Sequence, residues 1–130
     1  MPPDRRAEIG RRGEELAARR FERLGFEVVE RNYRTRAGEI DLIVRKDGTL
    51  VFCEVKALVA RSGGGVGPAF LLEAVGPAKR AQVRQLARSW LADRCDGRTR
   101  RFSEFRFDAI GVLVTQAGDL LQLEHIEAAF

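Results

Sequence analysis

A predicted β-hairpin centred on Asp47 and Gly48 constrains the fold of this chain more than any other feature of its sequence. Residues 39–46 and 50–56 on either side are rich in Val, Ile and Leu, and an Asp-Gly step between two such runs is typical of a two-residue hairpin turn. Residues at equal distances from the turn then pair with each other. Six apolar residues would share one face, which we expect to lie in the core: Ile40, Leu42, Val44, Val51, Cys53 and Val55.

The opposite face of this hairpin would bring charged side chains together. Its register pairs Asp41 with Glu54 and Glu39 with Lys56. Carboxylates directly opposite each other on antiparallel strands have Cβ atoms about 4.5–5.5 Å apart and repel, and a raised pKa or a bound cation relieves that repulsion. Oxygen ligands suit Mg²⁺ or Mn²⁺ better than zinc. The alternative interpretation is an exposed face on which these side chains are simply solvated.

Hydrophobic periodicity predicts the remaining elements. Residues 8–24 repeat apolar side chains at helical spacing up to Gly25, and Pro77 begins a second helix that reaches about residue 92. The other predicted strands cover residues 26–31, 105–114 and 120–124. A chain of 130 residues, 45% of them hydrophobic, is the usual size and composition of one domain. We therefore expect a single α/β domain with a mixed sheet over residues 1–130.

Glu14 lies on the inward side of the first predicted helix. It precedes Ala17, Ala18 and Phe21 by three, four and seven residues, whereas Glu15 falls on the outer side. A glutamate near the start of a helix also complements the helix dipole, which would explain either residue equally well. Position on the inward side makes Glu14 the better candidate for a functional site.

Basic residues are concentrated in one part of a chain whose net charge is +4. Residues 79–106 contain nine Lys or Arg and three Asp or Glu, whereas residues 107–130 contain four acidic residues and no Lys or Arg. Such a block is typical of a surface that binds a polyanion, and a solvated helix face explains it equally well.

Four of these basic residues belong to the second predicted helix. Arg80, Arg84 and Arg88 share the face opposite its apolar side and would hold a nucleic-acid backbone. Lys79 instead lies at the head of the inward side. For Lys79, a stem that covers the core edge with its ammonium in water is slightly favoured over a contact with the site.

Other features of the sequence argue against several classes of protein. No apolar run approaches the ~20 residues of a membrane helix, and the charged N-terminus does not resemble a secretory signal. Cys53 and Cys95 lack metal-ligand spacing and His125 is the only histidine, which argues against zinc. The glycine-rich residues 61–68 lack the Gly-Lys-Ser/Thr ending of a phosphate-binding loop. We expect a cytoplasmic protein without membrane contact.

The acidic residues resemble a known pattern. Asp41, followed after a hairpin by Glu54-Val55-Lys56 and preceded by a helical Glu14, resembles the PD-(D/E)xK nuclease superfamily with its restriction-endonuclease-like fold. More narrowly, the chain is similar to the YraN-like family of small uncharacterised bacterial proteins. The stretches that carry this likeness are residues 13–17, 31–34, 38–43, 51–56, 106–108 and 129–130.

The resemblance implies a three-layer α/β fold in which a mixed central sheet of about five strands lies between helices. It implies that Asp41 and Glu54 bind Mg²⁺ or Mn²⁺ beside the backbone carbonyl of Val55. Lys56 would orient the attacking water or stabilise charge in the transition state. Glu14 would hold the water, the lysine or a second ion.

The chain departs from the family pattern directly after the lysine. It reads Ala57-Leu58 where the family tends to have a small polar residue and an arginine, and Arg61 is a candidate replacement for the phosphate contact. Arg106 and Asp108, which alternation places on one face of a predicted strand, are best explained as a structural ion pair.

The leading hypothesis from the sequence is metal-dependent hydrolysis of phosphodiesters in DNA, branched or damaged DNA included. DNA is favoured over RNA, and the oligomeric state is left open, a homodimer included. The first alternative is a non-catalytic nucleic-acid-binding module that retains the nuclease fold. The second is an interaction protein that docks a partner through its acidic C-terminal segment.

Overall fold

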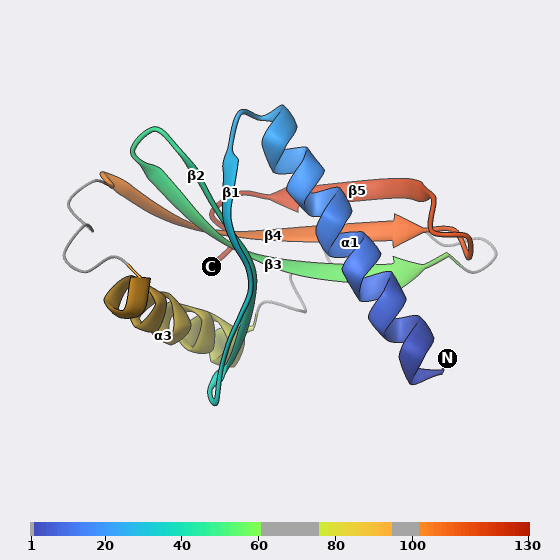
Figure 1. Ribbon diagram of the computed structural model, residues 1–130, viewed down its shortest axis with the longest axis horizontal. Helices are drawn as coiled ribbons and strands as arrows, with labels where there is room; N and C mark the ends of the chain where they lie inside the picture. The colour runs from blue at the N-terminus through green and yellow to red at the C-terminus, as the bar shows by residue number, and fades with distance from the viewer. Residues whose placement is uncertain (1, 61–75, 95–101) are drawn as a thin grey trace.

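The computed structural model describes residues 2–60, 76–94 and 102–130, and a five-stranded sheet organises them (Figure 1). Within these residues, one helix packs on each face of the sheet. The predicted α/β class, with a mixed sheet of five strands between helices, is therefore confirmed. The elements in chain order are α1 (Pro3–Arg23), β1 (Glu27–Thr35), β2 (Gly38–Lys46), β3 (Thr49–Val59), α3 (Pro77–Arg94), β4 (Glu104–Val114) and β5 (Leu120–Ile126).

The strands lie in the order β1-β2-β3-β4-β5, and only β3 and β4 pair in parallel. A parallel pair needs a long crossover connection, and α3 lies within that connection. The first two strands form a ribbon that crosses β3, β4 and β5 steeply in Figure 1, with α1 in front of the sheet. The ends of β2 and β3 nearest their shared turn therefore run together, whereas their other ends separate.

The hairpin register is correct near the turn and wrong beyond it. Leu42 pairs with Cys53, and the pairing continues through Lys46 and Thr49, as the two-residue turn predicts. The expected pairs of residues 39, 40 and 41 with 56, 55 and 54 are absent from this ladder, although all six residues are described. Instead, β2 continues along β1 as far as Gly38, and β3 continues along β4.

The point at which β2 separates from β3 lies beside a residue of β1 that has a left-handed backbone conformation. Asn32 has a φ of 51°, in the region where asparagine is among the more tolerated non-glycine residues, and it lies between Arg31 and Tyr33, the partners of Leu42 and Ile40. Tyr33 and Ile40 consequently face α3, whereas Leu42 faces α1. The prediction that Ile40 shares a face with Leu42 was therefore wrong.

Each face of the sheet carries its own hydrophobic core. Phe21 and Leu16 of α1 pack on Leu42, Val51 and other residues of the central strands. On the other face, α3 packs on the sheet through the side chains of Leu86, Ala87 and Trp90, and the sheet residues that receive them are Tyr33, Ile40, Ile43, Leu50 and Phe52. Both buried faces hold their helix in place, and so set where residues from α1 and α3 reach the sheet.

Two predicted boundaries fell short by four residues or more. The first helix begins at Pro3 rather than at residue 8, because a proline suits the first helical turn and an Arg5–Glu8 ion pair supports a polar stretch that has no apolar period. β1 reaches Thr35 rather than residue 31, because the left-handed Asn32 interrupts the alternation that would reveal a strand. Among the described residues, no helix is long and apolar enough to cross a membrane.

Gly13 brings α1 close to β3. A Cβ atom at this position would lie 2.6 Å from the Cβ atom of Ala57, which is closer than side-chain atoms approach each other. The missing side chain therefore allows the helix to rest on the strand, next to the position from which Glu14 extends.

We expect Gly13→Ala to lower the free energy of unfolding by about 1–3 kcal/mol through overpacking. Gly10, three residues earlier on the same helix, is the matched control because a Cβ atom there would have no neighbour within 4 Å. Gly10→Ala should stabilise the helix by up to about 1 kcal/mol. Urea denaturation of both variants tests the difference, and equal effects would contradict a close contact at Gly13.

Candidate functional site

Asp41 occupies the gap that opens where β2 leaves β3. Its Oδ2 atom accepts a hydrogen bond from the backbone N–H of Val55 at 2.7 Å. This bond satisfies a donor that would otherwise lack a partner on β2 once the strand ladder has ended. Asp41 is only 5% exposed, so its carboxylate is held in place and removed from bulk water.

The backbone carbonyl of Val55 belongs to the same gap. In an antiparallel pair, the N–H and C=O groups of one residue point toward the same neighbouring strand. Since the Val55 N–H is directed at Asp41, the carbonyl of this residue is on the β2 side of β3 as well. A carboxylate and a carbonyl oxygen therefore border one opening.

Glu54 lies beside this gap on the face covered by α3. Its Oε1 atom is 3.2 Å from Nζ of Lys79, and both side chains are largely buried. The favoured expectation for Lys79, a stem covering the core edge with its ammonium in water, was therefore wrong. The residue reaches Glu54 because α3 is anchored along the β1–β2 ribbon by further contacts, among them Tyr33 Oη to Asp93 at 2.9 Å and Trp90 Nε1 to Glu30 at 2.9 Å.

Burial raises the pKa values of both acids, and the charge of Glu54 raises that of Asp41 further. Burial, with the negative charge of Glu54 second, raises the pKa of Asp41 to about 8 despite the hydrogen bond from Val55. Burial also raises the pKa of Glu54, although the nearby ammonium of Lys79 opposes the shift. The carboxylates therefore lie close enough to influence each other, as the sequence suggested, although Asp41 and Glu54 are not a direct cross-strand pair.

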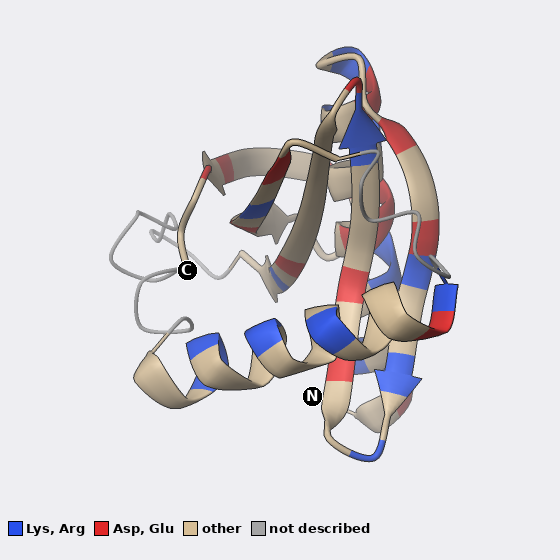
Figure 2. Ribbon diagram, turned by 90° about the vertical axis from the view of Figure 1, so that its left-hand side faces the viewer, with Lys and Arg blue, Asp and Glu red and all other residues tan. Residues whose placement is uncertain are grey.

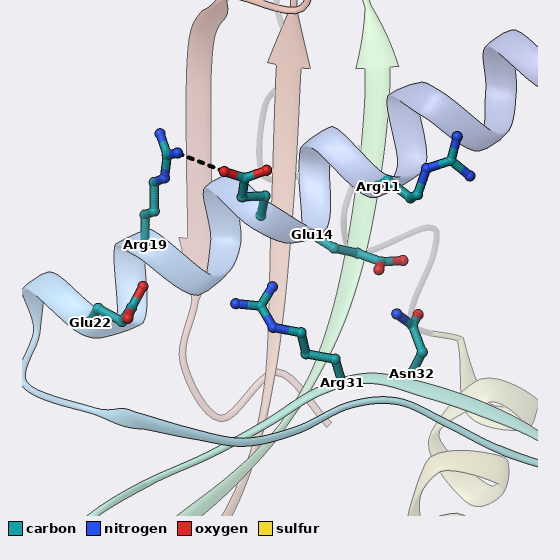
Figure 3. A pocket seen from close by; sticks show the side chains of 7 residues that line it. Arg11, Glu14, Arg19, Glu22, Arg31 and Asn32 are labelled. Carbon is teal, nitrogen blue, oxygen red and sulfur yellow. Dashed lines mark hydrogen bonds and ion pairs between the residues drawn. The ribbon is translucent and has the colours of Figure 1, made fainter.

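Glu14 approaches this acidic region from α1. Its side chain is half-buried and bonds to the side chain of Asn32, and burial is the largest cause of its raised pKa (Figure 3). Its charge also acts on Asp41. Glu15 is exposed and pairs with Arg19 at 2.6 Å, so the choice of Glu14 as the inward glutamate is consistent with the structure.

Two residues at the site were not recognised from the sequence. Asn32 was part of a matching stretch but had no role, and only the three-dimensional structure places its amide next to Glu14. Glu39 was expected opposite Lys56, but it pairs with Arg34 at 2.9 Å and its charge raises the pKa of the acids at the site. Both contacts follow from the course of β1 at the left-handed Asn32, which no alternating sequence pattern reveals.

Lys56 is exposed on the same face of β3 as Glu54, two residues away. Its positive charge lowers the pKa of Glu54, although less than Lys79 does. Ala57 packs toward α1 rather than toward solvent. Arg61, the predicted replacement for a phosphate contact, and the glycine-rich residues 61–68 lie outside the described part of the chain.

The oxygen atoms at this site suit a hard divalent cation that keeps part of its water shell. Carboxylate oxygens of Asp41 and Glu54 and the carbonyl of Val55 are oxygen ligands of the kind that Mg²⁺ prefers. Within the described residues, no three Asp, Glu, His or Cys side chains are grouped closely enough to hold a metal ion by themselves. Because Mg²⁺ usually keeps several waters and uses one or two carboxylates, this set meets its needs without a third side chain.

The basic face of α3 is arranged as the sequence predicts. Arg80, Arg84 and Arg88 are exposed, and basic residues recur along the helix in Figure 2. The guanidinium of Arg84 lies 5.4 Å from the centre of the Phe107 ring. The arginines at 98, 100 and 101 fall outside the described residues.

A second buried carboxylate has a structural role. Asp108 is fully buried and receives two hydrogen bonds from Arg106 at 2.9 Å, with Nε2 of His125 at 2.8 Å and a further bond from the backbone N–H of Ala128. The predicted Arg106–Asp108 ion pair is confirmed. These contacts attach the C-terminal segment to β4.

These features define the class of protein. A mixed five-stranded sheet between two helices, with clustered acids where two of its strands diverge, is consistent with a restriction-endonuclease-like α/β fold. The chain belongs to the uncharacterised protein family UPF0102, whose model matches residues 13–112, and the resemblance to the YraN-like family is confirmed. All the site residues named above from the described chain lie within the matched range.

Curated relatives cover nearly the whole chain. A UPF0102 protein of Acidothermus cellulolyticus is 40% identical over 131 residues, which cover 96% of this chain and 95% of that protein. A UPF0102 protein of Streptomyces griseus is 47% identical over 113 residues, covering 87% and 88%. A third, from Frankia casuarinae, is 43% identical over 122 residues, covering 94% and 95%.

The Lys79–Glu54 ion pair leads to a prediction about metal affinity. Lys79→Met should strengthen Mg²⁺ binding by about fivefold, because an ammonium competing for the carboxylate is worth up to ~1 kcal/mol. The comparison belongs at alkaline pH, because loss of Lys79 removes a charge that lowers the pKa of Glu54 and protons then compete with the cation. Isothermal titration calorimetry measures the affinity, with Arg88→Met on the exposed face of α3 as control. Unchanged or weaker binding would contradict competition by Lys79.

Proposed function

We propose that this protein hydrolyses phosphodiester bonds in DNA with Mg²⁺ or Mn²⁺ bound by Asp41, Glu54 and the carbonyl of Val55. The observation that carries this proposal is the confined pair of acids beside the end of the β2–β3 ladder. Both acids have raised pKa values caused first by burial. A divalent cation bound beside two buried carboxylates relieves the repulsion between their charges.

Three further functions assist that pair, one from the cation and two from side chains of the protein. When bound, the cation would polarise a water and screen the phosphate charge. The exposed ammonium of Lys56 can stabilise negative charge on the phosphate. Glu14, held by Asn32, can accept a proton from the attacking water because its pKa is raised above the ordinary glutamate value.

The exposed arginines of α3 support a nucleic acid as the substrate. Arg80, Arg84 and Arg88 follow one face of the helix that also delivers Lys79 to Glu54. Contacts of this kind hold the phosphate backbone and do not read base sequence. One Trp, one Tyr and eight Phe are present, and Trp90 and Phe52 are buried against each other, so little aromatic surface supports base stacking. DNA recognised by shape fits these features best.

A cleavage assay tests the proposal. Linear, flapped and four-way DNA are incubated with the protein in Mn²⁺ or Mg²⁺, with Lys56→Ala as the comparison and EDTA as the metal-free control. We expect cleavage of at least one substrate that EDTA abolishes and that Lys56→Ala lowers by ~10²-fold or more. Metal-independent cleavage, or equal rates for both proteins, would contradict the assigned site.

A non-catalytic nucleic-acid-binding module is the second candidate. The Lys79 ammonium already neutralises part of the Glu54 charge, and no three acidic side chains are grouped for metal binding within the described residues. If this candidate is correct, the wild-type protein binds DNA in a salt-dependent manner but cleaves none of the substrates in either metal.

A further inference from the structure

A groove of about 390 Å³ opens between α1 and β1, directly beside Glu14 (Figure 3). We call it the α1–β1 groove. It lies on the face of the sheet opposite α3, and so is separate from the arginines of that helix. The residues that line it are Arg11, Glu14, Glu15, Arg19, Glu22, Arg31 and Asn32.

The arginines of this groove differ in whether their charge is already paired. Arg19 donates to Glu15 at 2.6 Å. Arg11 and Arg31, in contrast, make no hydrogen bond or ion pair with any described residue, and both side chains are exposed. In Figure 3 they come from different elements, Arg11 from α1 and Arg31 from β1, and lie on either side of Glu14 with their guanidinium groups directed away from each other.

Two exposed guanidinium groups without an ion-pair partner, one on each side of Glu14, are suited to two separate phosphates of a strand that passes this residue. Arginine has five N–H donors in a rigid planar fork, which matches the non-bridging oxygens of a phosphate. Of the acids in the groove, Glu15 is paired with Arg19, and Glu14 is bonded to Asn32 and lies within the field of Arg31. Glu22 lies toward the Arg19 end of the groove in Figure 3.

We propose that the α1–β1 groove binds two successive phosphodiesters of the substrate strand next to the one being hydrolysed, one through Arg11 and one through Arg31. This inference rests on the proposed function. Glu14 links the two places, because it lines the groove and its charge also acts on Asp41. The strand would therefore leave the acidic site along α1, while the arginines of α3 contact the nucleic acid on the other side of the sheet.

The test compares two double variants that each remove two positive charges. Arg11→Ala/Arg31→Ala removes the unpaired arginines of the groove. Arg5→Ala/Arg45→Ala is the control, because Arg5 is paired with Glu8 and Arg45 with Glu27. Binding of fluorescently labelled duplex DNA is measured by anisotropy in EDTA, where metal-dependent cleavage does not occur, over a series of salt concentrations.

We expect the groove variant to bind DNA about tenfold more weakly than the control and to lower the slope of log affinity against log salt by about two, since each lost phosphate contact removes ~0.9. Equal affinities and slopes for the two variants would contradict phosphate binding by Arg11 and Arg31. A wild-type protein that does not bind DNA would contradict it as well. Cleavage is assayed separately. Wild type that binds DNA with this dependence on Arg11 and Arg31 but never cleaves it would reject hydrolysis while supporting a phosphate site in the groove.

Discussion

Asp41→Asn should abolish metal-dependent cleavage and, in the absence of metal, should make the folded protein more stable at alkaline pH. Asparagine retains an oxygen that can accept the hydrogen bond from Val55 but carries no charge to bind a cation. Loss of a metal ligand removes several kcal/mol of transition-state stabilisation, so cleavage should fall by ~10³-fold or more. A residue that costs stability and supports activity is typical of a functional site.

The pH dependence follows from the direction of the Asp41 shift. Its pKa is about 8 in the folded protein and ~3.9 in an unfolded chain. Between these values the folded state keeps a proton that the unfolded state has released, so stability falls as the pH rises from ~4 toward about 8. Asp41→Asn should remove this part of the slope.

Urea denaturation of metal-free wild type and Asp41→Asn at several pH values measures the effect. One pKa unit corresponds to ~1.4 kcal/mol. Even a quarter of the Asp41 pKa shift would therefore make the free energy of unfolding of Asp41→Asn measurably higher than that of wild type above pH 8. Added Mg²⁺ should stabilise the wild type and leave the variant unchanged. A variant that is less stable than wild type at alkaline pH would contradict a repelled, buried carboxylate.

Asp108→Ala should have the opposite consequence and lower the free energy of unfolding by about 3–5 kcal/mol, because it leaves the buried partners of a charge network without their acceptor. Burial by itself would raise the pKa of Asp108, but the hydrogen bonds from His125, Arg106 and Ala128 outweigh it and hold the pKa below its usual value. Its stabilisation is therefore complete at neutral pH and is lost as the pH falls through the lowered value.

Thermal and urea denaturation of Asp108→Ala at neutral pH measure the loss, with Asp119→Ala in the exposed turn before β5 as the control. The control should change the free energy of unfolding by no more than ~0.5 kcal/mol. If Asp108→Ala does not fold, Asp108→Asn, which retains an acceptor, should fold with reduced stability. Similar effects of the Asp108 and Asp119 substitutions would contradict the network.

The two buried aspartates show how far sequence reasoning extends. Asp108 was recognised as an ion-pair partner because Arg106 is two residues away on the same strand, and such a distance follows from strand geometry alone. Asp41 was predicted to be a site residue because of repulsion from Glu54, and the charge of Glu54 does raise its pKa, but the expected cross-strand pair was wrong. The strand ladder ends at Leu42, and the hydrogen bond to Val55 replaces the expected cross-strand pair.

The sequence by itself determined the hairpin turn, the pairing of Leu42 through Lys46 with β3 and the apolar face that Leu42, Val44, Val51 and Cys53 share. Turn chemistry and the two-residue period of a strand act over a few residues, so a local pattern is enough to specify them. Only the tertiary structure decided that β2 leaves β3 at Asp41, that Lys79 meets Glu54 and that Asn32 supports Glu14. These contacts join residues far apart in the chain, and their distances depend on how two helices pack on a twisted sheet, which no local pattern encodes.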